Sequence, residues 1–259
     1  MYKNLLTAMF LITLFFSCTA NQAMLRQKAE ASRELAGAYI EQEKYTLALR
    51  ELLKGEQYFA DDPDLQNDLG FVYMQKNRLD LAVQHFKRAL ELKPDYPAAK
   101  NNLGVAYLKG REWEQAIAVF SELTGNLLYT TPQKPLVNLA LAYYNKKDYV
   151  HAEQYYNEAL SLYREGFRKD SDYLKAVYGL SQIYLDSGRA SEAITLLKAS
   201  IPDAPRAYPL YFNLAVAYEF LSDYSRAYEA YQKVIEIAPG SDLAKKAGQA
   251  SEKIKNLRQ

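Results

Sequence analysis

The sequence predicts an all-α solenoid of about six stacked helical hairpins, closed by one C-terminal helix. A motif of Leu, a small residue, two variable residues and Tyr returns about every 34 residues, and such a period is typical of stacked repeats. Later in each unit an Ala is followed, four residues on, by a bulky residue, which predicts a second helix. The motifs span Leu35–Tyr39, Leu69–Tyr73, Leu103–Tyr107, Leu139–Tyr143, Leu180–Tyr184 and Leu214–Tyr218, and the later pairs are Ala48/Leu52, Ala82/Phe86, Ala116/Phe120, Ala152/Tyr156, Ala193/Leu197 and Ala227/Tyr231.

The N-terminus has the pattern of a secretory signal peptide. A short basic start at Lys3 precedes an apolar run from Leu5 to Phe16, which is too short to span a bilayer as a helix. A run of this length is typical of the apolar part of a signal peptide. We therefore expect residues 1–17 to be a signal segment that lies outside the folded repeats.

The only cysteine of the chain, Cys18, directly follows this run and the small residue Ser17. The ending resembles a bacterial lipobox, in which the Cys becomes the first mature residue and carries acyl chains. The lipobox usually has Leu where this chain has Phe15. The resemblance implies a lipidated Cys18, with residues 18–28 as the anchor and a short polar tether; an ordinary signal peptide is the alternative.

The residue after the cysteine indicates to which membrane such a lipoprotein would be sorted. Thr19 stands there rather than Asp, which by the sorting rule of enteric bacteria implies the outer membrane, with the protein on its periplasmic face. Several acyl chains would anchor it stably, because each buried CH₂ contributes about 0.8 kcal/mol.

The repeat pattern resembles the tetratricopeptide repeat (TPR). The second repeat matches that family's pattern at Leu69, Gly70, Tyr73, Ala82, Phe86, Ala89 and Pro94. The resemblance implies two antiparallel helices per repeat, a right-handed superhelical solenoid and a role in binding proteins. Small residues such as Gly70 let the two helices approach closely, and Pro94 ends the second helix.

The repeats are expected to fill residues 29–239, with two irregular joints. The small residues of the motif stand at 36, 70, 104, 140, 181 and 215, so the steps are 34, 34, 36, 41 and 34. Two extra residues therefore enter before the fourth repeat, and seven enter before the fifth, near Phe167. Insertions in repeat arrays map to loops or helix extensions.

Residues 240–259 are expected to form a capping helix. Gly240-Ser241-Asp242 is a signal for a helix start. The helix that follows has apolar residues at helical spacing, which would cover the exposed face of the last repeat, as the ends of solenoids require. These residues are Leu243, Ala247, Ala250, Ile254 and Leu257.

Composition and motifs argue against catalysis, metal binding and nucleic-acid binding. The formal net charge is only +1, and a single Cys provides neither a disulfide framework nor a Cys-based metal site. His85 and His151 have no metal-ligand spacing and are expected to be exposed polar residues of second helices. Known catalytic and phosphate-binding motifs are absent. We therefore expect no enzyme activity, no cofactor and no metal.

The first helices are expected to line a concave groove that binds a partner protein. The TPR pattern places the inward positions around the Leu of each motif, and they are apolar for a surface that faces solvent, which is typical of a partner site. The inward residues are Asn67, Phe71, Met74, Asn101, Asn102, Val105, Leu108, Val137, Asn138, Leu141, Tyr144, Tyr178, Gln182, Leu185, Phe212, Asn213, Val216, Glu219 and Phe220.

An amide directly precedes the motif Leu in three repeats, at Asn102, Asn138 and Asn213. Some TPR proteins hold an extended peptide backbone with such a ladder, because an amide offers both a donor and an acceptor. The alternative is that these residues only hydrogen-bond within the repeats. The Lys/Asn clamp that other TPR proteins use for acidic C-terminal peptides is absent, which disfavours binding of chaperone tails.

Six repeats behind a lipobox-like ending resemble the pilotin lipoproteins of type IV pili, the PilF/PilW family. The joint Tyr129-Thr130-Thr131-Pro132, which leads into Asn138-Leu139-Ala140, adds to this resemblance. The family implies an outer-membrane lipoprotein that helps to localise or assemble a secretin pore, without catalytic residues. The alternative is a repeat lipoprotein that tethers peptidoglycan hydrolases or assists other envelope assembly.

Overall fold

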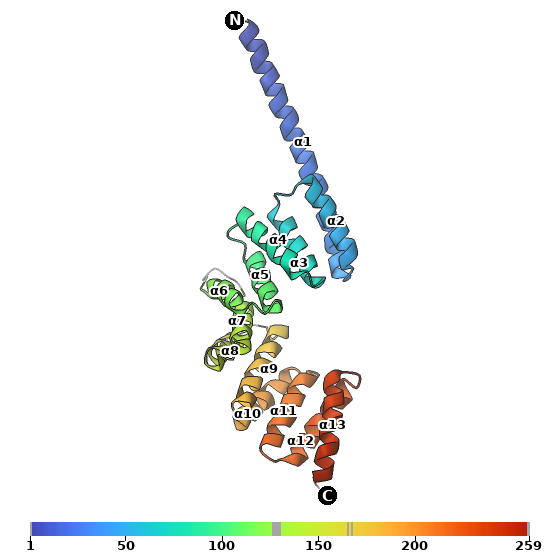
Figure 1. Ribbon diagram of the computed structural model, residues 1–259, viewed down its shortest axis with the longest axis vertical. Coiled ribbons are helices and arrows are strands. Elements are labelled where there is room, and N and C mark those ends of the chain that lie inside the picture. Colours follow the sequence, from blue (N-terminus) through green and yellow to red (C-terminus); the bar gives the residue numbers. More distant parts are fainter. Residues whose placement is uncertain (1, 126–130, 165, 167, 258–259) are drawn as a thin grey trace. The chain divides into compact units, whose positions relative to one another are not determined.

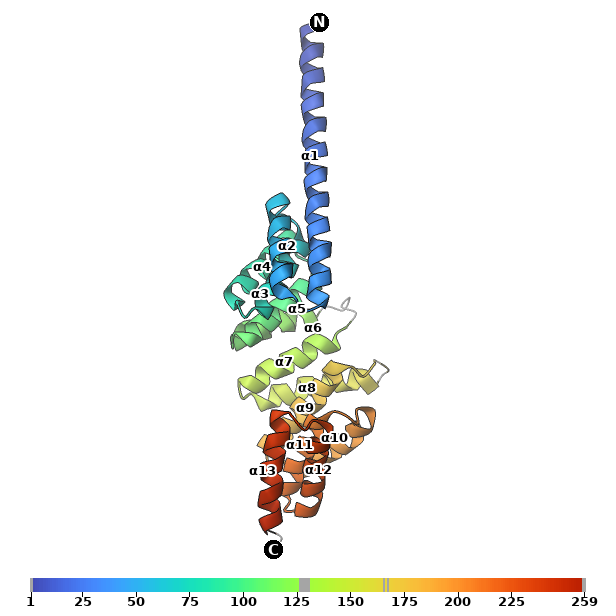
Figure 2. The same cartoon turned by 90° about the vertical axis from the view of Figure 1, so that its right-hand side faces the viewer.

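The structure is a computed structural model, which describes residues 2–125, 131–164, 166 and 168–257; within 2–20 it describes the helix but no side chain. These residues form thirteen α-helices and one short 3₁₀ helix, with no strand among them (Figures 1 and 2). The prediction of an all-α chain with twelve repeat helices and one terminal helix is confirmed. The chain divides into two units, Met1–Val119 and Phe120–Gln259.

The first unit begins with the long helix α1, which covers the expected signal segment and tether and continues as the first helix of the first repeat. Its later part packs against α2, where Ala29 and Ala36 are buried. No helix in the described part of the chain is long and apolar enough to cross a membrane. The helices are α1 (Tyr2–Glu41), α2 (Tyr45–Tyr58), α3 (Pro63–Gln75), α4 (Leu79–Leu92) and α5 (Pro97–Lys109); α6 (Trp113–Thr124) ends in the second unit.

The second unit contains the last three repeats and the terminal helix α13. This helix packs against α12 and α11, with Ala244, Ala247 and Ile254 buried, as expected of a cap. The elements are α7 (Gln133–Asn145), α8 (Tyr149–Arg164), α9 (Ser171–Asp186), α10 (Ala190–Ser200), the 3₁₀ helix η1 (Ile201–Asp203), α11 (Tyr208–Phe220), α12 (Tyr224–Ile237) and α13 (Asp242–Leu257). Residues 126–130 of the first irregular joint, and Phe167 of the second, lie outside the described residues.

Each hairpin turns through one residue in the left-handed region. The backbone N–H of the next residue donates to the carbonyl of the motif Tyr, as from Arg78 to Tyr73 at 2.9 Å and from Arg189 to Tyr184 at 2.7 Å. This bond is that of a Schellman cap, which ends the first helix and reverses the chain. The left-handed residues, with φ from 56 to 71°, are Glu43, Asn77, Arg111, Lys147, Gly188 and Ser222.

Carboxylates and prolines fix where some of the helices begin. The Asp62 side chain accepts from the backbone N–H of Asp64 at 2.9 Å, and Pro63 supplies the first helical position of α3. Asp170 caps α9 in the same way, because its carboxylate accepts from the N–H groups of Asp172 and Tyr173. These caps set the start of two first helices.

The helices of each unit form two layers. In unit 2 the first helices α7, α9 and α11 pack side by side, and in unit 1 α3 packs against α1 and α5. The second helices α2, α4, α8, α10 and α12 each pack against their own first helix and against the helix that follows. Among these five helices no comparable contact joins one second helix to another. Each row of first helices is therefore the tighter, inner layer of its unit.

Gly70 makes the close contact that its motif position predicts. A Cβ added to Gly70 would lie 2.6 Å from two ring carbons of Phe86, which is fully buried. Gly70 is on α3 and Phe86 on α4, so this contact joins the two helices of one repeat. The absence of a side chain at Gly70 is what lets the ring fill the space between them.

A second glycine contact joins two repeats and was not predicted. A Cβ on Gly179 of α9 would lie 2.3 Å from Cζ of Tyr156, which is buried on the preceding helix α8. In other repeats this position, directly before the motif Leu, holds a polar residue such as Asn138 or Asn213. The ring of Tyr156 takes the space that this polar side chain would need.

We predict that Gly70→Leu lowers the melting temperature sharply, because overpacking a filled core typically costs about 1–3 kcal/mol. The matched control is Gly37→Ala in the same unit, since a Cβ at Gly37 would meet nothing within 4 Å. Because Ala favours helix over Gly by about 1 kcal/mol, the control is expected to be neutral or stabilising. Thermal unfolding followed by circular dichroism measures both, and an unchanged melting temperature for Gly70→Leu would show that the repeat register is wrong.

Candidate partner-binding surface

The predicted groove residues lie on the inner layers, on α3 and α5 in one unit and on α7, α9 and α11 in the other. In unit 2 the accessible groove residues form what we call the first-helix surface, which consists of Leu141, Tyr144, Tyr178, Gln182, Phe212, Val216 and Phe220. Leu141 and Tyr178 are each 37% exposed and Phe220 is 60% exposed, whereas the other four residues are half-buried. In unit 1 the half-buried residues Phe71, Asn101, Asn102 and Val105 occupy the equivalent positions.

Three of the predicted binding residues are not available to a partner. Val137 is 2% exposed and belongs to the apolar core, Asn213 is 0% exposed, and Asn67 is 9% exposed. The same correction holds for Met74, Leu108 and Leu185, which are buried as well. Motif spacing correctly places these residues on first helices. It does not show that neighbouring repeats cover them.

The amides of the expected ladder connect neighbouring first helices. In unit 2 the Asn213 side chain donates to Oγ of Ser181 at 2.8 Å and accepts from Nε2 of Gln182 at 2.6 Å. Both partners lie on α9, so Asn213 uses its donor and its acceptor to hold α11 against α9. The Ser181 hydroxyl in turn donates to the carbonyl of Tyr178. Of the two hypotheses for this residue, hydrogen bonding inside the repeat array applies, and Asn213 does not grip a peptide.

The position directly before the motif Leu also connects neighbouring first helices in unit 1. Asn102 of α5 donates to Oδ1 of Asn67 on α3 at 3.0 Å. Asp68, which follows Asn67, faces Arg33 of α1 at 3.7 Å, and its side chain is 27% exposed. Burial raises the pKa of Asp68 to about 6, although the Arg33 charge opposes the shift. Side chains at and beside the ladder position therefore connect α1, α3 and α5.

Two aromatic residues of the first-helix surface, Tyr144 and Phe212, also make contacts within the fold. The Tyr144 hydroxyl donates to Asp186 at 2.8 Å, and burial together with this bond raises its pKa, so that it stays protonated. Phe212 packs edge to face against Tyr231, with ring centroids 5.6 Å apart. Each residue still offers part of its surface, but each also stabilises unit 2.

The two histidines differ in their surroundings. His151 is exposed, as expected, and hydrogen-bonds with Asp148 at 2.7 Å. His85 is half-buried rather than exposed: it stacks on Tyr73 and its Nδ1 lies 2.7 Å from Oε1 of Gln66. Burial lowers the pKa of His85, which favours its neutral form. No group of three or more His, Cys, Asp or Glu in the described chain is arranged to hold a metal ion.

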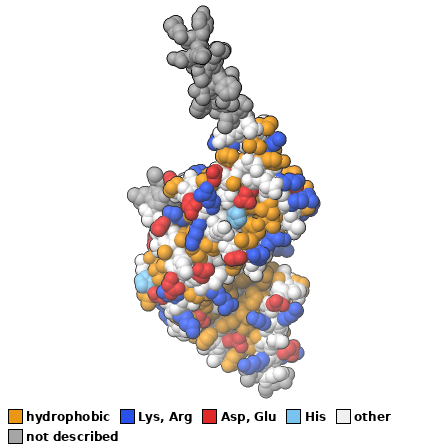
Figure 3. Space-filling view, turned by 45° about the horizontal axis from the view of Figure 1, so that its top comes forward, with side chains coloured by type: hydrophobic (Ala, Val, Ile, Leu, Met, Phe, Trp, Pro, Cys, Tyr) orange, Lys and Arg blue, Asp and Glu red, His pale blue; other side chains and the backbone are white. Residues whose placement is uncertain are grey.

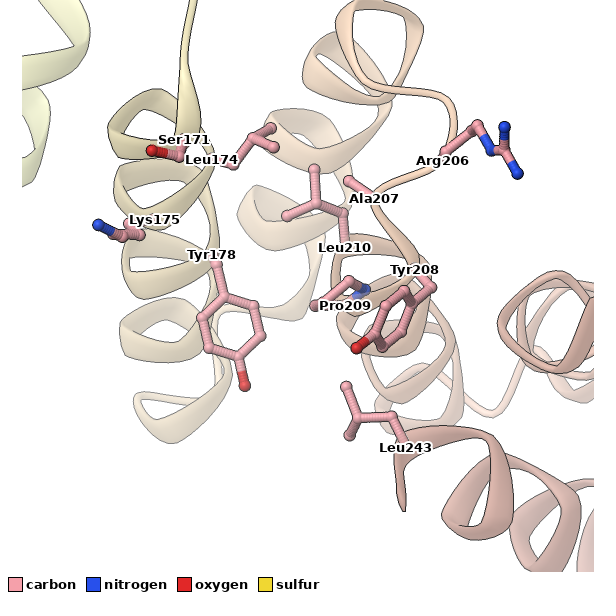
Figure 4. Close-up of a pocket in the computed structure, with 10 residues that line it drawn as sticks. All are labelled: Ser171, Leu174, Lys175, Tyr178, Arg206, Ala207, Tyr208, Pro209, Leu210 and Leu243. Carbon is pink, nitrogen blue, oxygen red and sulfur yellow. The ribbon is translucent and has the colours of Figure 1, made fainter. Parts of the chain in front are cut away.

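A pocket in unit 2 was missed by the sequence reasoning. It lies between α9, the start of α11 and the start of α13, and its volume is about 380 Å³ (Figure 4). We call it the C-terminal pocket; its walls are Leu174, Tyr178, Tyr208, Pro209, Leu210 and Leu243. Only Tyr178 was among the predicted residues. The available signal was Leu243, an apolar side chain in the first turn of the capping helix.

Family models for the tetratricopeptide repeat match four stretches of the chain, residues 72–110, 134–165, 150–218 and 208–241. No curated protein sequence matches the chain. The family models therefore confirm tetratricopeptide repeats within residues 72–110 and 134–241, whereas the bounds 29–239 for six repeats stay a prediction.

Solved structures of similar fold include PilW, described as a widely conserved type IV pilus biogenesis factor (TM-score 0.71, 18% identity, 84% of this chain and 97% of PilW covered). PilF of Pseudomonas aeruginosa is similar too (0.70, 17%, 87% and 98%). So is a tetratricopeptide repeat protein of Parabacteroides merdae (0.68, 20%, 89% and 90%). At these identities the likeness shows the fold alone.

We predict that Asp68→Asn stabilises the protein at neutral pH. Because the folded pKa of about 6 lies above the ordinary value of 3.8, the folded chain binds more protons than the unfolded chain between these pH values. The ionised carboxylate therefore weakens the fold above this window, and the gain from Asn is about 1–2 kcal/mol near pH 7 and fades toward pH 4.

Urea unfolding of both proteins from pH 4 to pH 7.5 measures this difference. The control is Asp80→Asn, whose exposed carboxylate has a pKa lowered by the backbone N–H of Leu81, so that its loss is not expected to stabilise at neutral pH. A gain for Asp68→Asn that is equal at all pH values would contradict the assignment.

Proposed function

Because this chain is a tetratricopeptide repeat protein, we propose that it is a non-catalytic, protein-binding scaffold: an outer-membrane lipoprotein that assists type IV pilus biogenesis by localising or assembling a secretin. The repeats themselves indicate a fold that binds other proteins. We propose in addition the pilus role, the lipid anchor at Cys18, the periplasmic location and the secretin partner.

One observation carries the binding role. The row of first helices in unit 2 presents three large apolar side chains, those of Leu141, Tyr178 and Phe220, to solvent. Large aromatic and aliphatic side chains that stay accessible on an inner helix layer are typical anchors for a partner. The tight hydrogen bonds beneath them, such as those of Asn213, keep this surface rigid.

The envelope setting is supported by the N-terminus. The lipobox-like sequence before Cys18 favours a lipid anchor, and the chain spans 97% and 98% of the lengths of the PilW and PilF structures. An array of this extent held at the outer membrane would meet a secretin subunit where that subunit inserts. The similarity to the PilW and PilF structures supports the architecture of this proposal, and the proposed lipid anchor would hold the protein at the outer membrane.

We predict that Cys18→Ser releases the protein from the membrane fraction or stops its processing. Lipidation requires the thiol, and Ser keeps nearly the same size. Cell fractionation, together with metabolic labelling by a fatty-acid analogue, measures both effects. A wild-type protein that takes up no label would exclude the anchor.

The partner itself can be tested by crosslinking and pull-down from membranes. We predict that the wild type captures a secretin subunit and that Leu141→Ser combined with Phe220→Ser reduces capture by about tenfold or more, as expected when exposed anchors are removed. These exposed residues are a sharper test than Tyr144 or Phe212, whose loss would also weaken the fold.

The matched control is Val150→Ser on the second helix α8, where Val150 is 77% exposed. It removes an exposed aliphatic residue of the same unit and is expected to leave capture unchanged. Loss of capture in this control with retention in the double variant would place the binding surface on the second helices. Capture of peptidoglycan hydrolases in place of a secretin would favour the alternative role as their adaptor.

A further inference from the structure

The helix that carries the expected anchor continues into the fold without a break. α1 runs from Tyr2 to Glu41, so the chain between Cys18 and the first repeat is helical, and Figures 1 and 2 show α1 leaving unit 1 as one straight helix. With a rise of about 1.5 Å per residue, Arg26 lies about 12 Å and Lys28 about 15 Å from Cys18 along the helix axis. An anchor at Cys18 would therefore hold this end of unit 1 next to the bilayer.

Two basic side chains lie on aromatic rings at this end of unit 1. The guanidinium carbon of Arg26 is 4.6 Å from the ring centre of Phe59, and Nζ of Lys28 is 5.6 Å from that of Tyr58. Tyr58 is the last residue of α2, and Phe59 follows it. Such a contact holds a cation in place without neutralising its charge. Both basic residues are exposed, and neither has an ion pair among the described side chains.

The carboxylates of the same end accept hydrogen bonds from within the fold. Asp61 accepts from a guanidinium of α4 at 2.6 Å, Asp62 caps α3, and Glu56 accepts from an amide of α3 at 3.1 Å. Glu30 is the first acidic residue of the sequence, and it lies about 18 Å from Cys18 along α1, beyond both cations. The two cations are therefore the charged groups that this end leaves available to an external anion.

The rest of this end suits a membrane interface. Met24 is 46% exposed and Tyr58 is 39% exposed, and Figure 3 shows basic and hydrophobic side chains together where α1 leaves unit 1. Proteins place Tyr, Lys and Arg at the level of the lipid headgroups, which form a layer of about 5–8 Å on each side of the hydrocarbon. Side chains of a helix lean toward its N-terminus, so the two cations of α1 lean toward Cys18 and toward this layer.

We propose that this end of unit 1 rests on the headgroups of the membrane that holds Cys18, with both cations on lipid phosphates. We call it the membrane-proximal end; it consists of Met24, Arg26, Lys28, Tyr58 and Phe59. The inference rests on the proposed lipid anchor and adds a second contact, which orients the first repeat on the membrane. Two basic residues alone bind a bilayer weakly, but the anchor offers them to the headgroups at a high effective concentration.

The test uses the full protein, extracted from membranes and reconstituted into vesicles that contain phosphatidylglycerol and a dansyl-labelled lipid. Trp113, the only Trp of the chain, is replaced by Phe, and Gln57→Trp then places a fluorescent donor in the last turn of α2. Energy transfer to the dansyl headgroups is expected to be at least about twofold higher than from Gln42→Trp, which lies about 24 Å further along α1 than Arg26. Equal transfer from the two sites would overturn the proposal.

Charge reversal separates contact with the headgroups from proximity to the bilayer. Arg26→Glu combined with Lys28→Glu is expected to lower transfer from the Gln57→Trp donor by about twofold or more, and high salt is expected to act in the same direction. The matched control, Lys44→Glu combined with Lys76→Glu, reverses two charges at the hairpin turns of the same unit and is expected to leave transfer unchanged. Circular dichroism confirms that both variants are folded.

Two results would refute the contact. Transfer that stays the same after reversal of Arg26 and Lys28 would show that these cations do not bind the headgroups. A dimer in detergent that the same reversal dissociates, with equal transfer in phosphatidylglycerol and phosphatidylcholine vesicles, would replace the membrane by a second copy of the chain.

The outcomes separate this inference from the proposed function. Charge-dependent transfer without secretin capture would support the headgroup contact and refute the pilus role. Secretin capture together with transfer that does not respond to charge reversal would support the pilus role and refute the contact. A chain that takes up no fatty-acid label would refute both the lipid anchor and the contact that rests on it.

Discussion

The close approach of two helices within a repeat is the constraint on which the other features depend. Gly70 allows it in the second repeat, where the ring of Phe86 lies in the space that a Cβ would occupy. Once a hairpin is closed in this way, its second helix can pack against the next first helix, and the first helices come into contact with each other. The inner layer, with its accessible apolar side chains and its pocket, results from that packing.

The hydrogen bonds between repeats explain why the inner surface can be both apolar and well defined. Buried amides are costly unless both their donor and their acceptor are satisfied, and Asn213 satisfies both through Ser181 and Gln182. Such bonds have directional requirements that apolar contacts lack, so they fix the angle between neighbouring first helices. A surface whose spacing is fixed in this way binds a partner without a large loss of conformational entropy. Asn102 and Asn213, which the sequence offered as peptide contacts, instead hold neighbouring first helices together.

The sequence was sufficient to predict the helices, the hairpins, the contact at Gly70 and the terminal cap, because each depends on local spacing within one repeat. It was insufficient for features that depend on two repeats at once. The motif pattern does not show that Tyr156 reaches Gly179, or that Val137 and Asn67 are covered. The left-handed residues of the hairpin turns could not be recognised from the sequence either, because only Gly188 among them is a glycine. A Schellman bond to the carbonyl of the motif Tyr holds each turn instead. The C-terminal pocket needs α9, α11 and α13 together, so no single stretch of sequence indicates it.

The distribution of charge bears on how such a scaffold selects its partner. Lys and Arg side chains are mixed with Asp and Glu over the face shown in Figure 3, and the formal net charge is only +1. A long-range field therefore contributes little to steering, and selection must come from short-range features. Many surface charges are already paired within one helix, as Lys233 is with Glu236, and such exposed pairs contribute little to binding or stability. On a nearly neutral repeat surface, selectivity then depends on short-range contacts with the side chains that the fold leaves accessible, such as Leu141 and Phe220.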